Sequence, residues 1–197
     1  ASDVYKRQIL QAWYPGQAGG LAVADVLFGD FNPSGKLPVT FYKNTDQLPD
    51  FEDYSMKNRT YRYMTEVPLF PFGYGLSYTT FDISKGRLNK KTISAGQDLN
   101  FKVNVKNTGK YDGAEVIQVY VRKVDDAEGP IKSLRAFRRV PLKAGETCVV
   151  SIDLLPTTFE FFDPTTNTMR IMPGKYEIMY GNSSDIPSGN KLSVTLR

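Results

Sequence analysis

An alternation of apolar and polar residues with a period of two runs from Thr79 to the end of the chain, and it constrains the fold more than any other feature. Successive side chains of a β-strand point to opposite faces, so this period predicts strands that are buried on one face. Turn residues such as Asn107-Thr108-Gly109 and Asp112-Gly113 separate the runs. The expected strands lie within residues 99–105, 117–121, 131–142 (a looser pair of short runs), 148–154, 159–162, 169–172, 176–180 and 192–196.

About seven strands with turns between them are typical of an immunoglobulin-like β-sandwich. The chain has one cysteine, Cys148, and one tryptophan, so the Cys–Trp–Cys pattern of antibody domains is missing and a fibronectin type III-like sandwich is favoured. Cys148 lies in an alternating apolar run and is expected to be a buried small hydrophobe. The chain is therefore predicted to be mainly β.

The N-terminal part of the chain has a different pattern, which predicts a strand–helix–strand unit. Residues 9–14 are expected to form a buried strand, and residues 21–28 a helix that is buried on most sides and ends at Gly29. Residues 36–41 are expected to form a short strand at the edge or end of a sheet, because proline cannot donate to a central ladder. Such a unit is typical of the closing part of an α/β sandwich domain, and the rest of that domain is expected upstream.

An aromatic segment punctuated by proline and glycine, residues 68–81, connects the two parts. Proline fixes φ, glycine allows close approaches, and the aromatic rings need a surface to lie on. A flexible connection would be polar and rich in glycine and serine, so this segment is expected to pack between two domains. The predicted organisation is the end of an α/β sandwich domain over residues 1–45, an irregular linker over 46–75 and the fibronectin type III-like domain over 76–197.

Tyrosine, arginine and carboxylate side chains are interleaved in the linker. Aromatic rings stack on sugar faces and charged groups bind hydroxyls, so some of these residues are candidates for substrate binding. The candidates are Arg59, Tyr61, Arg62 and Tyr63. A solvated connector with surface ion pairs accounts for them equally well, and both interpretations stay open. The nearby carboxylates suggest a catalytic pair, but a loop is a poor platform for two carboxyl groups at a fixed distance. These carboxylates are Asp46, Asp50, Glu52 and Asp53.

Composition excludes several classes of function. The 25 basic and 21 acidic residues give a net charge of +4, and the densest basic cluster, Arg135, Arg138 and Arg139, is interpreted as a solvated strand face rather than a nucleic-acid surface. No apolar run is long enough to span a membrane. The chain has no histidine, which removes every mechanism that needs an imidazole base, and no cluster with zinc-ligand spacing. No metal and no cofactor are expected.

Three groups of segments together resemble glycoside hydrolase family 3. Residues 12–30 and 32–41 look like the end of the family's second domain, residues 59–63 and 70–79 like its link to the C-terminal domain, and residues 105–109, 113–121 and 173–176 like its fibronectin type III-like domain. The resemblance extends from Ile9 to Arg197. Residues 1–8 do not share it, which suggests a foreign or mis-joined segment, and Ala18 stands where many members carry an acidic residue.

This resemblance implies a retaining β-glycosidase that removes terminal β-linked glucose or xylose from oligosaccharides. In the family, the nucleophilic Asp lies in an N-terminal barrel and the acid/base Glu in the second domain, both upstream of Ile9. The chain is therefore expected to be a C-terminal fragment that is inactive alone, with β-glycosides and the missing barrel and α/β domain as the partners of its parent. A periplasmic or secreted parent is compatible with the resemblance. The alternatives are a non-catalytic carbohydrate-binding or adhesion module and a structural spacer.

Overall fold

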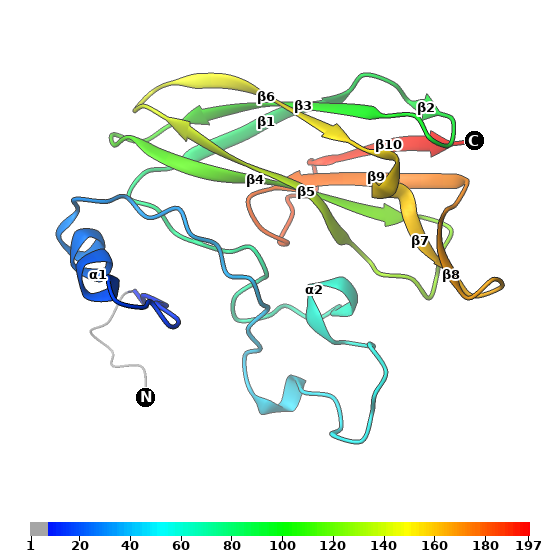
Figure 1. Ribbon diagram of the computed structural model, residues 1–197, viewed down its shortest axis with the longest axis horizontal. Coiled ribbons are helices and arrows are strands. Elements are labelled where there is room, and N and C mark those ends of the chain that lie inside the picture. Colours follow the sequence, from blue (N-terminus) through cyan, green and yellow to red (C-terminus); the bar gives the residue numbers. More distant parts are fainter. Residues whose placement is uncertain (1–7) are drawn as a thin grey trace.

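The computed structural model describes residues 8–197, which form a β-sandwich, a linker along one of its faces and a short helix at one end (Figure 1). The first sheet is antiparallel and has the order β1 (Phe81–Leu88), β3 (Leu99–Asn107) and β6 (Thr147–Leu154). The second sheet has the order β2 (Thr92–Ile93), β10 (Lys191–Leu196), β9 (Gly174–Gly181), β4 (Gly113–Lys123) and β5 (Ser133–Leu142). Its neighbours are antiparallel except β2 and β10. The turn η2 (Pro156–Phe159) leads into a hairpin of β7 (Glu160–Asp163) and β8 (Thr168–Ile171).

The alternating residues form the core between the two sheets. In β3, Leu99, Phe101, Val103 and Val105 are fully buried, whereas Lys102 between them is exposed. Full burial of one such apolar side chain stabilises the fold by about 1.5–3 kcal/mol. The apolar core is therefore the main reason why these runs become strands.

The prediction of a fibronectin type III-like sandwich is confirmed, and the expected runs lie in β3, β4, β6, β7, β8, β9 and β10. The expectation of two short runs over residues 131–142 is wrong, because one strand, β5, spans residues 133–142. Its register against β4 shifts between Val119 and Tyr120, which breaks the alternation. The sequence pattern did not indicate β1, in which Lys85 has a φ of 56° and the register shifts between Ser84 and Arg87.

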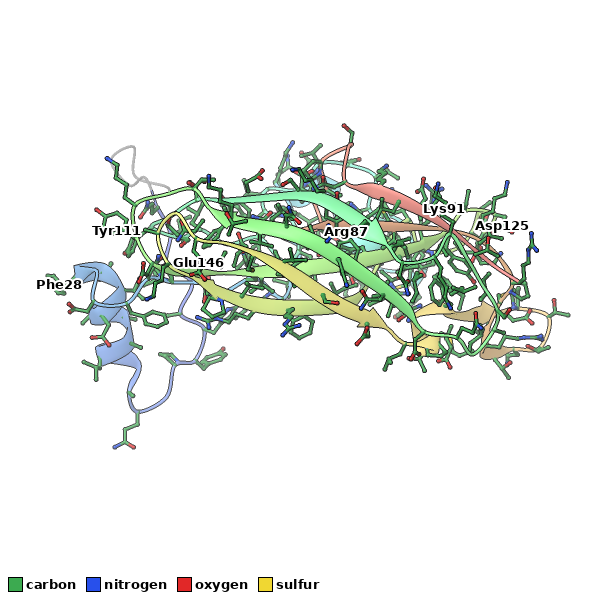
Figure 2. The ribbon with its side chains drawn as sticks, turned by 90° about the horizontal axis from the view of Figure 1, so that it is seen from above. Phe28, Arg87, Lys91, Tyr111, Asp125 and Glu146 are labelled. Atoms are coloured by element: carbon green, nitrogen blue, oxygen red, sulfur yellow. The ribbon has the colours of Figure 1, made fainter. Side chains whose placement is uncertain are left out.

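The N-terminal unit agrees with the prediction only in its helix. Helix α1 (Gly19–Phe28) ends at Gly29, which adopts the left-handed conformation with a φ of 87°. Residues 9–14 form no strand, and residues 36–41 contribute only an isolated bridge between Phe41 and Phe70. The helix is not buried on most sides: Phe28 is 85% exposed and lies on the side of α1 that points away from the sandwich (Figure 2). Within residues 8–197, every sheet is built from strands after residue 80, so the N-terminal unit has no sheet of its own on which residues 9–14 could pair or α1 could pack.

The aromatic segment 68–81 packs between the N-terminal segment and the second sheet, as expected. On one side the backbone N–H of Gly73 donates to the carbonyl of Leu37 (2.8 Å). On the other side Nε2 of Gln118 on β4 donates to the carbonyl of Gly73 (3.1 Å). Gly73 has a φ of 78°, and a Cβ there would come within 2.1 Å of Oε1 of Gln118. A glycine is therefore required at this close approach.

Candidate functional site

Tyr61, one of the candidate binding residues, lies in the short helix α2 (Thr60–Tyr63) and fastens the linker to the sandwich. Its ring stacks on Phe72 with centroids 4.3 Å apart and meets the ring of Tyr120 edge-on at 5.7 Å. Its hydroxyl accepts a hydrogen bond from the backbone N–H of Leu134 (3.1 Å). Tyr61 thus covers the outer face of β4, and this cover explains why Tyr120 is fully buried although it points away from the core.

Arg62 contacts the start of β5. Its Nε donates to Oγ of Ser133 (3.3 Å), and its carbonyl accepts from the backbone N–H of Ile131 (2.8 Å). Its guanidinium carbon lies 5.5 Å from the centroid of the Tyr63 ring, a distance at which a cation and an aromatic face attract. Arg62 and Tyr63 therefore form one half-buried unit, which brings these two candidates together.

Arg59 lies apart from that unit and orders the preceding loop. Its Nε donates to the carbonyl of Ser55 (2.9 Å), and its Nη2 donates to the carbonyls of Asp50 (3.3 Å) and Asp53. Within residues 8–197, none of the four candidates forms an ion pair with a carboxylate. The interpretation as a connector held by surface ion pairs therefore does not describe these contacts.

Two carboxylate groups of the linker, those of Asp50 and Asp53, act as caps of turns. Oδ1 of Asp50 accepts from the backbone N–H of Glu52 (2.9 Å), and Oδ1 of Asp53 accepts from that of Ser55 (2.8 Å). The bonds from Ser55, with Arg59 and Lys57 nearby, lower the pKa of Asp53. A carboxyl group with a lowered pKa stays ionised and is a poor proton donor, so Asp53 does not suit the role of a general acid. The turn η1 (Thr45–Gln47) and a small pocket of about 230 Å³ lie beside these residues.

The interpretation of the arginine cluster on β5 as a solvated face is only partly right. Arg138 and Arg139 are exposed, whereas Arg135 is half-buried, with its guanidinium carbon 4.9 Å from the centroid of the Phe161 ring. Its Nη2 donates to the carbonyl of Glu160 (2.6 Å). Burial lowers the pKa of Arg135, and the Arg62 charge adds to that effect. The hairpin of β7 and β8 covers this part of the strand.

A groove with a volume of about 940 Å³ lies between the linker and the sandwich. Tyr61 is the one candidate binding residue that lines it. Sequence reasoning missed the residues of its opposite wall, Arg122, Lys132 and 182–185. These residues lie about 50 to 110 positions after the end of the linker, and no local motif marks them.

Among residues 8–197, no group of three or more Cys, Asp or Glu side chains is placed to hold a metal ion. No helix of the same residues is long and apolar enough to cross a membrane.

Cys148 is a free, half-buried thiol packed against the core, and burial raises its pKa.

Two family models match the chain, one after the other. Residues 5–78 match the glycosyl hydrolase family 3 C-terminal domain, and residues 115–184 match the fibronectin type III-like domain. The first match ends within the aromatic segment, and the second lies within the sandwich.

Similar proteins carry glycosidase names. The chain is 57% identical to a xylan 1,4-beta-xylosidase of Xylanibacter ruminicola, over 95% of this chain and 22% of the relative. It is 39% identical to a periplasmic beta-glucosidase of Salmonella typhimurium, over 89% of this chain and 25% of the relative. The chain thus spans about a quarter of the length of these relatives.

Solved structures give the same result. A beta-glucosidase of Bifidobacterium adolescentis superposes with a TM-score of 0.80 at 33% identity, over 94% of this chain and 29% of the other. A beta-glucosidase of Listeria innocua in complex with glucose superposes with a TM-score of 0.77 at 33% identity, over 93% and 27%. Together with these relatives, the two family models show that residues 5–78 carry the glycosyl hydrolase family 3 C-terminal domain and that residues 115–184 carry the fibronectin type III-like domain.

Proposed function

We propose that this chain is the C-terminal part of a retaining β-glycosidase that removes terminal β-linked xylose or glucose from oligosaccharides. The observation that carries the proposal is the 57% identity to the xylan 1,4-beta-xylosidase over nearly the whole chain. The identity to the periplasmic beta-glucosidase is 39%, so we place β-xylosides before β-glucosides. The name of that second relative also supports a periplasmic or secreted location for the full-length protein.

The chain supplies scaffold and a rim of the active-site entrance in this proposal. Residues 1–45 complete an α/β sandwich domain, residues 46–75 form the linker and residues 76–197 fold as the sandwich. Arg62 and Tyr63 are the best placed of the four candidates to touch substrate, because a guanidinium above a tyrosine ring offers donors and an apolar face together. Tyr61 positions them through its contacts with Phe72 and Leu134. Arg59 positions the loop that precedes them.

The catalytic carboxyl groups lie outside this chain in our proposal. A retaining glycosidase needs a nucleophile and an acid/base about 5–5.5 Å apart on rigid elements. Asp50 and Asp53 instead accept backbone hydrogen bonds in an irregular loop. The resemblance to the family likewise puts both catalytic positions before Ile9.

An assay of nitrophenol release from aryl β-xyloside and aryl β-glucoside tests the proposal. The full-length protein should release nitrophenol, and the purified 197-residue chain should not. Turnover by the chain alone that is lost in Asp50→Asn or Asp53→Asn would put the active site in the linker. A full-length protein that folds, binds xylo-oligosaccharides and cleaves neither substrate would favour the non-catalytic binding module.

A further inference from the structure

The groove between the linker and the sandwich has the dimensions of a ligand site. Its volume of about 940 Å³ lies within the range of roughly 300–1,000 Å³ that is usual for small-molecule pockets. The linker forms one wall and the sandwich loops form the other. The linker wall includes residues 64–71 and 74–76, and the sandwich wall consists of Arg122, Ile131, Lys132 and residues 182–185.

The linker wall is mainly apolar and aromatic, and Glu66 is its one charged residue. The rings of Phe70 and Tyr74 are stacked with centroids 5.4 Å apart, and both are half-buried. Leu69 is 52% and Leu76 57% exposed, so apolar surface remains open on this wall. Sugar rings carry C–H groups on their faces, and aromatic or aliphatic side chains are the surfaces on which such faces lie.

The sandwich wall is polar and offers donors and acceptors. Nζ of Lys132 donates to the carbonyl of Ser184 (2.6 Å), the one hydrogen bond that this ammonium makes within residues 8–197. An ammonium group has three donors, so Lys132 retains capacity for a ligand. Arg122 adds donors, and the exposed Asp185 adds carboxylate acceptors. The wall is held in place from behind, because the backbone N–H of Ser184 donates to the carbonyl of Phe72 (2.8 Å).

The charges of the groove balance. Arg122 and Lys132 are cationic, and Glu66 and Asp185 are anionic. An anionic ligand would be expected to meet a surplus of cations. A neutral ligand whose hydroxyls both donate and accept, and whose rings have apolar faces, matches the two walls together.

We propose that this groove binds a neutral β-linked oligosaccharide, with its sugar rings on the linker wall and its hydroxyls on the sandwich wall. The choice of β-linked pentose or hexose units rests on the proposed function. The site itself rests on the groove, on the stacked pair Phe70 and Tyr74, and on the polar groups of Arg122, Lys132 and Asp185.

Binding to the whole 197-residue chain tests this proposal without any hydrolysis. Xylotriose and cellotriose are titrated into ¹⁵N-labelled chain, with maltotriose as the α-linked control, and backbone amide shifts are followed. We expect saturable shifts at residues 69–76, 131–132 and 182–185 with the β-linked sugars and weaker shifts with maltotriose. Because the chain alone carries no turnover in our scheme, failure of catalysis in the full-length protein leaves this result unchanged.

Charge-removing variants check the assignment. Arg122→Met and Asp185→Asn should each weaken binding at least fivefold in calorimetry, whereas Lys102→Met and Asp98→Asn, exposed residues outside the groove, should leave it unchanged. Thermal melts identify any variant that fails to fold. If a variant does not fold, the proposal is judged on the amide shifts of the wild-type chain alone. No shifts at millimolar sugar, or shifts that map outside the groove, would overturn the proposal.

Discussion

At the residue scale, a few buried polar side chains join the linker to the sandwich, and Gln118 illustrates how. Its side-chain Nε2 donates to the carbonyls of Gly73 (3.1 Å) and Asn182 (2.7 Å), and its Oε1 accepts from the hydroxyl of Tyr120 (2.5 Å). Gln118 is 2% exposed, and burial of a polar group is tolerated only when its hydrogen bonds are made. The alternation of apolar residues in β4 predicted that Gln118 faces solvent. The side chain is buried instead, because the linker folds back over β4, and a local sequence pattern does not reveal such a contact.

The substitution Gln118→Leu should destabilise the chain, because it leaves buried carbonyls and the Tyr120 hydroxyl without partners. Each unsatisfied buried group costs about 1–3 kcal/mol, so we expect a loss in the free energy of unfolding of at least about 2 kcal/mol. Urea unfolding followed by fluorescence measures it. Gln17→Leu, at an exposed position, is the control and should change the stability little. Equal stabilities of the two variants would mean that the Gln118 contacts contribute nothing.

Arg62→Ala tests the role of the linker in the full-length enzyme. The change removes the bond to Ser133 and the contact with the Tyr63 ring. We expect kcat/KM for aryl β-xyloside to fall several-fold, which corresponds to about 1 kcal/mol. Arg87→Ala, on the opposite sheet, should leave kcat/KM unchanged. Unaltered kinetics in Arg62→Ala would make the linker a connector without a part in substrate binding.

At the element scale, the sequence predicted those strands that depend on a one-sided core and failed where pairing depends on distant segments. The runs of β3, β6 and β10 are confirmed because each buries alternate residues against the opposite sheet. The apolar run 9–14 is not a strand. A strand needs a neighbouring strand to pair with, and the apolar composition of a run does not show whether one is present. The candidate residues Tyr61 and Arg62 could be named from the linker sequence, but their partners Ser133 and Leu134 lie about 70 positions away and could not be inferred.

The close contact between the linker and residues 33–41 depends on Gly75. A Cβ at this position would lie 2.1 Å from the carbonyl oxygen of Gly35, and backbone cannot move aside as a flexible side chain can. Gly75→Ala should therefore destabilise the chain by about 1–3 kcal/mol, as overpacking usually does. Gly35→Ala, on the facing segment, has no atom within 4 Å of its added Cβ and serves as the control in the same urea unfolding. A Gly75→Ala variant as stable as wild type would show that this contact is loose.

The β7–β8 hairpin depends on the ionised form of Asp163. Its carboxylate accepts from the backbone N–H of Thr165 (3.0 Å) and the hydroxyl of Thr166 (3.1 Å) and pairs with Arg170 (3.2 Å), and these contacts lower its pKa. A lowered folded-state pKa means that the stabilisation is present above the ordinary aspartate value of about 3.9 and is lost as the pH falls below it. Asp163→Asn should be less stable than wild type at pH 7, and the difference should shrink between about pH 4 and pH 3. A difference that stays constant over this range would exclude the ionised carboxylate as its cause.

At the scale of the whole molecule, the hydrophobic core belongs to one part of the chain. The core cluster between the sheets extends from Ile93 to Leu196, with Phe81 and Ile83 packed against it. Among the described residues before Phe81, Met64 is the one large apolar side chain that is buried. Apolar burial is the dominant favourable term in folding, so residues 8–75 depend on the sandwich, or on further protein, for their structure.

This distribution predicts that residues 76–197 fold alone and that residues 1–75 do not. The isolated sandwich should melt cooperatively, because its core is complete and cooperative unfolding is usual for single domains of this size. It should melt at a lower temperature than the full chain, because removal of the linker uncovers Tyr120 and takes Gly73 away from Gln118. Circular dichroism melts of the two pieces and of the full chain measure both effects. A cooperative transition in residues 1–75, or none in residues 76–197, would contradict the division of the chain at the aromatic segment.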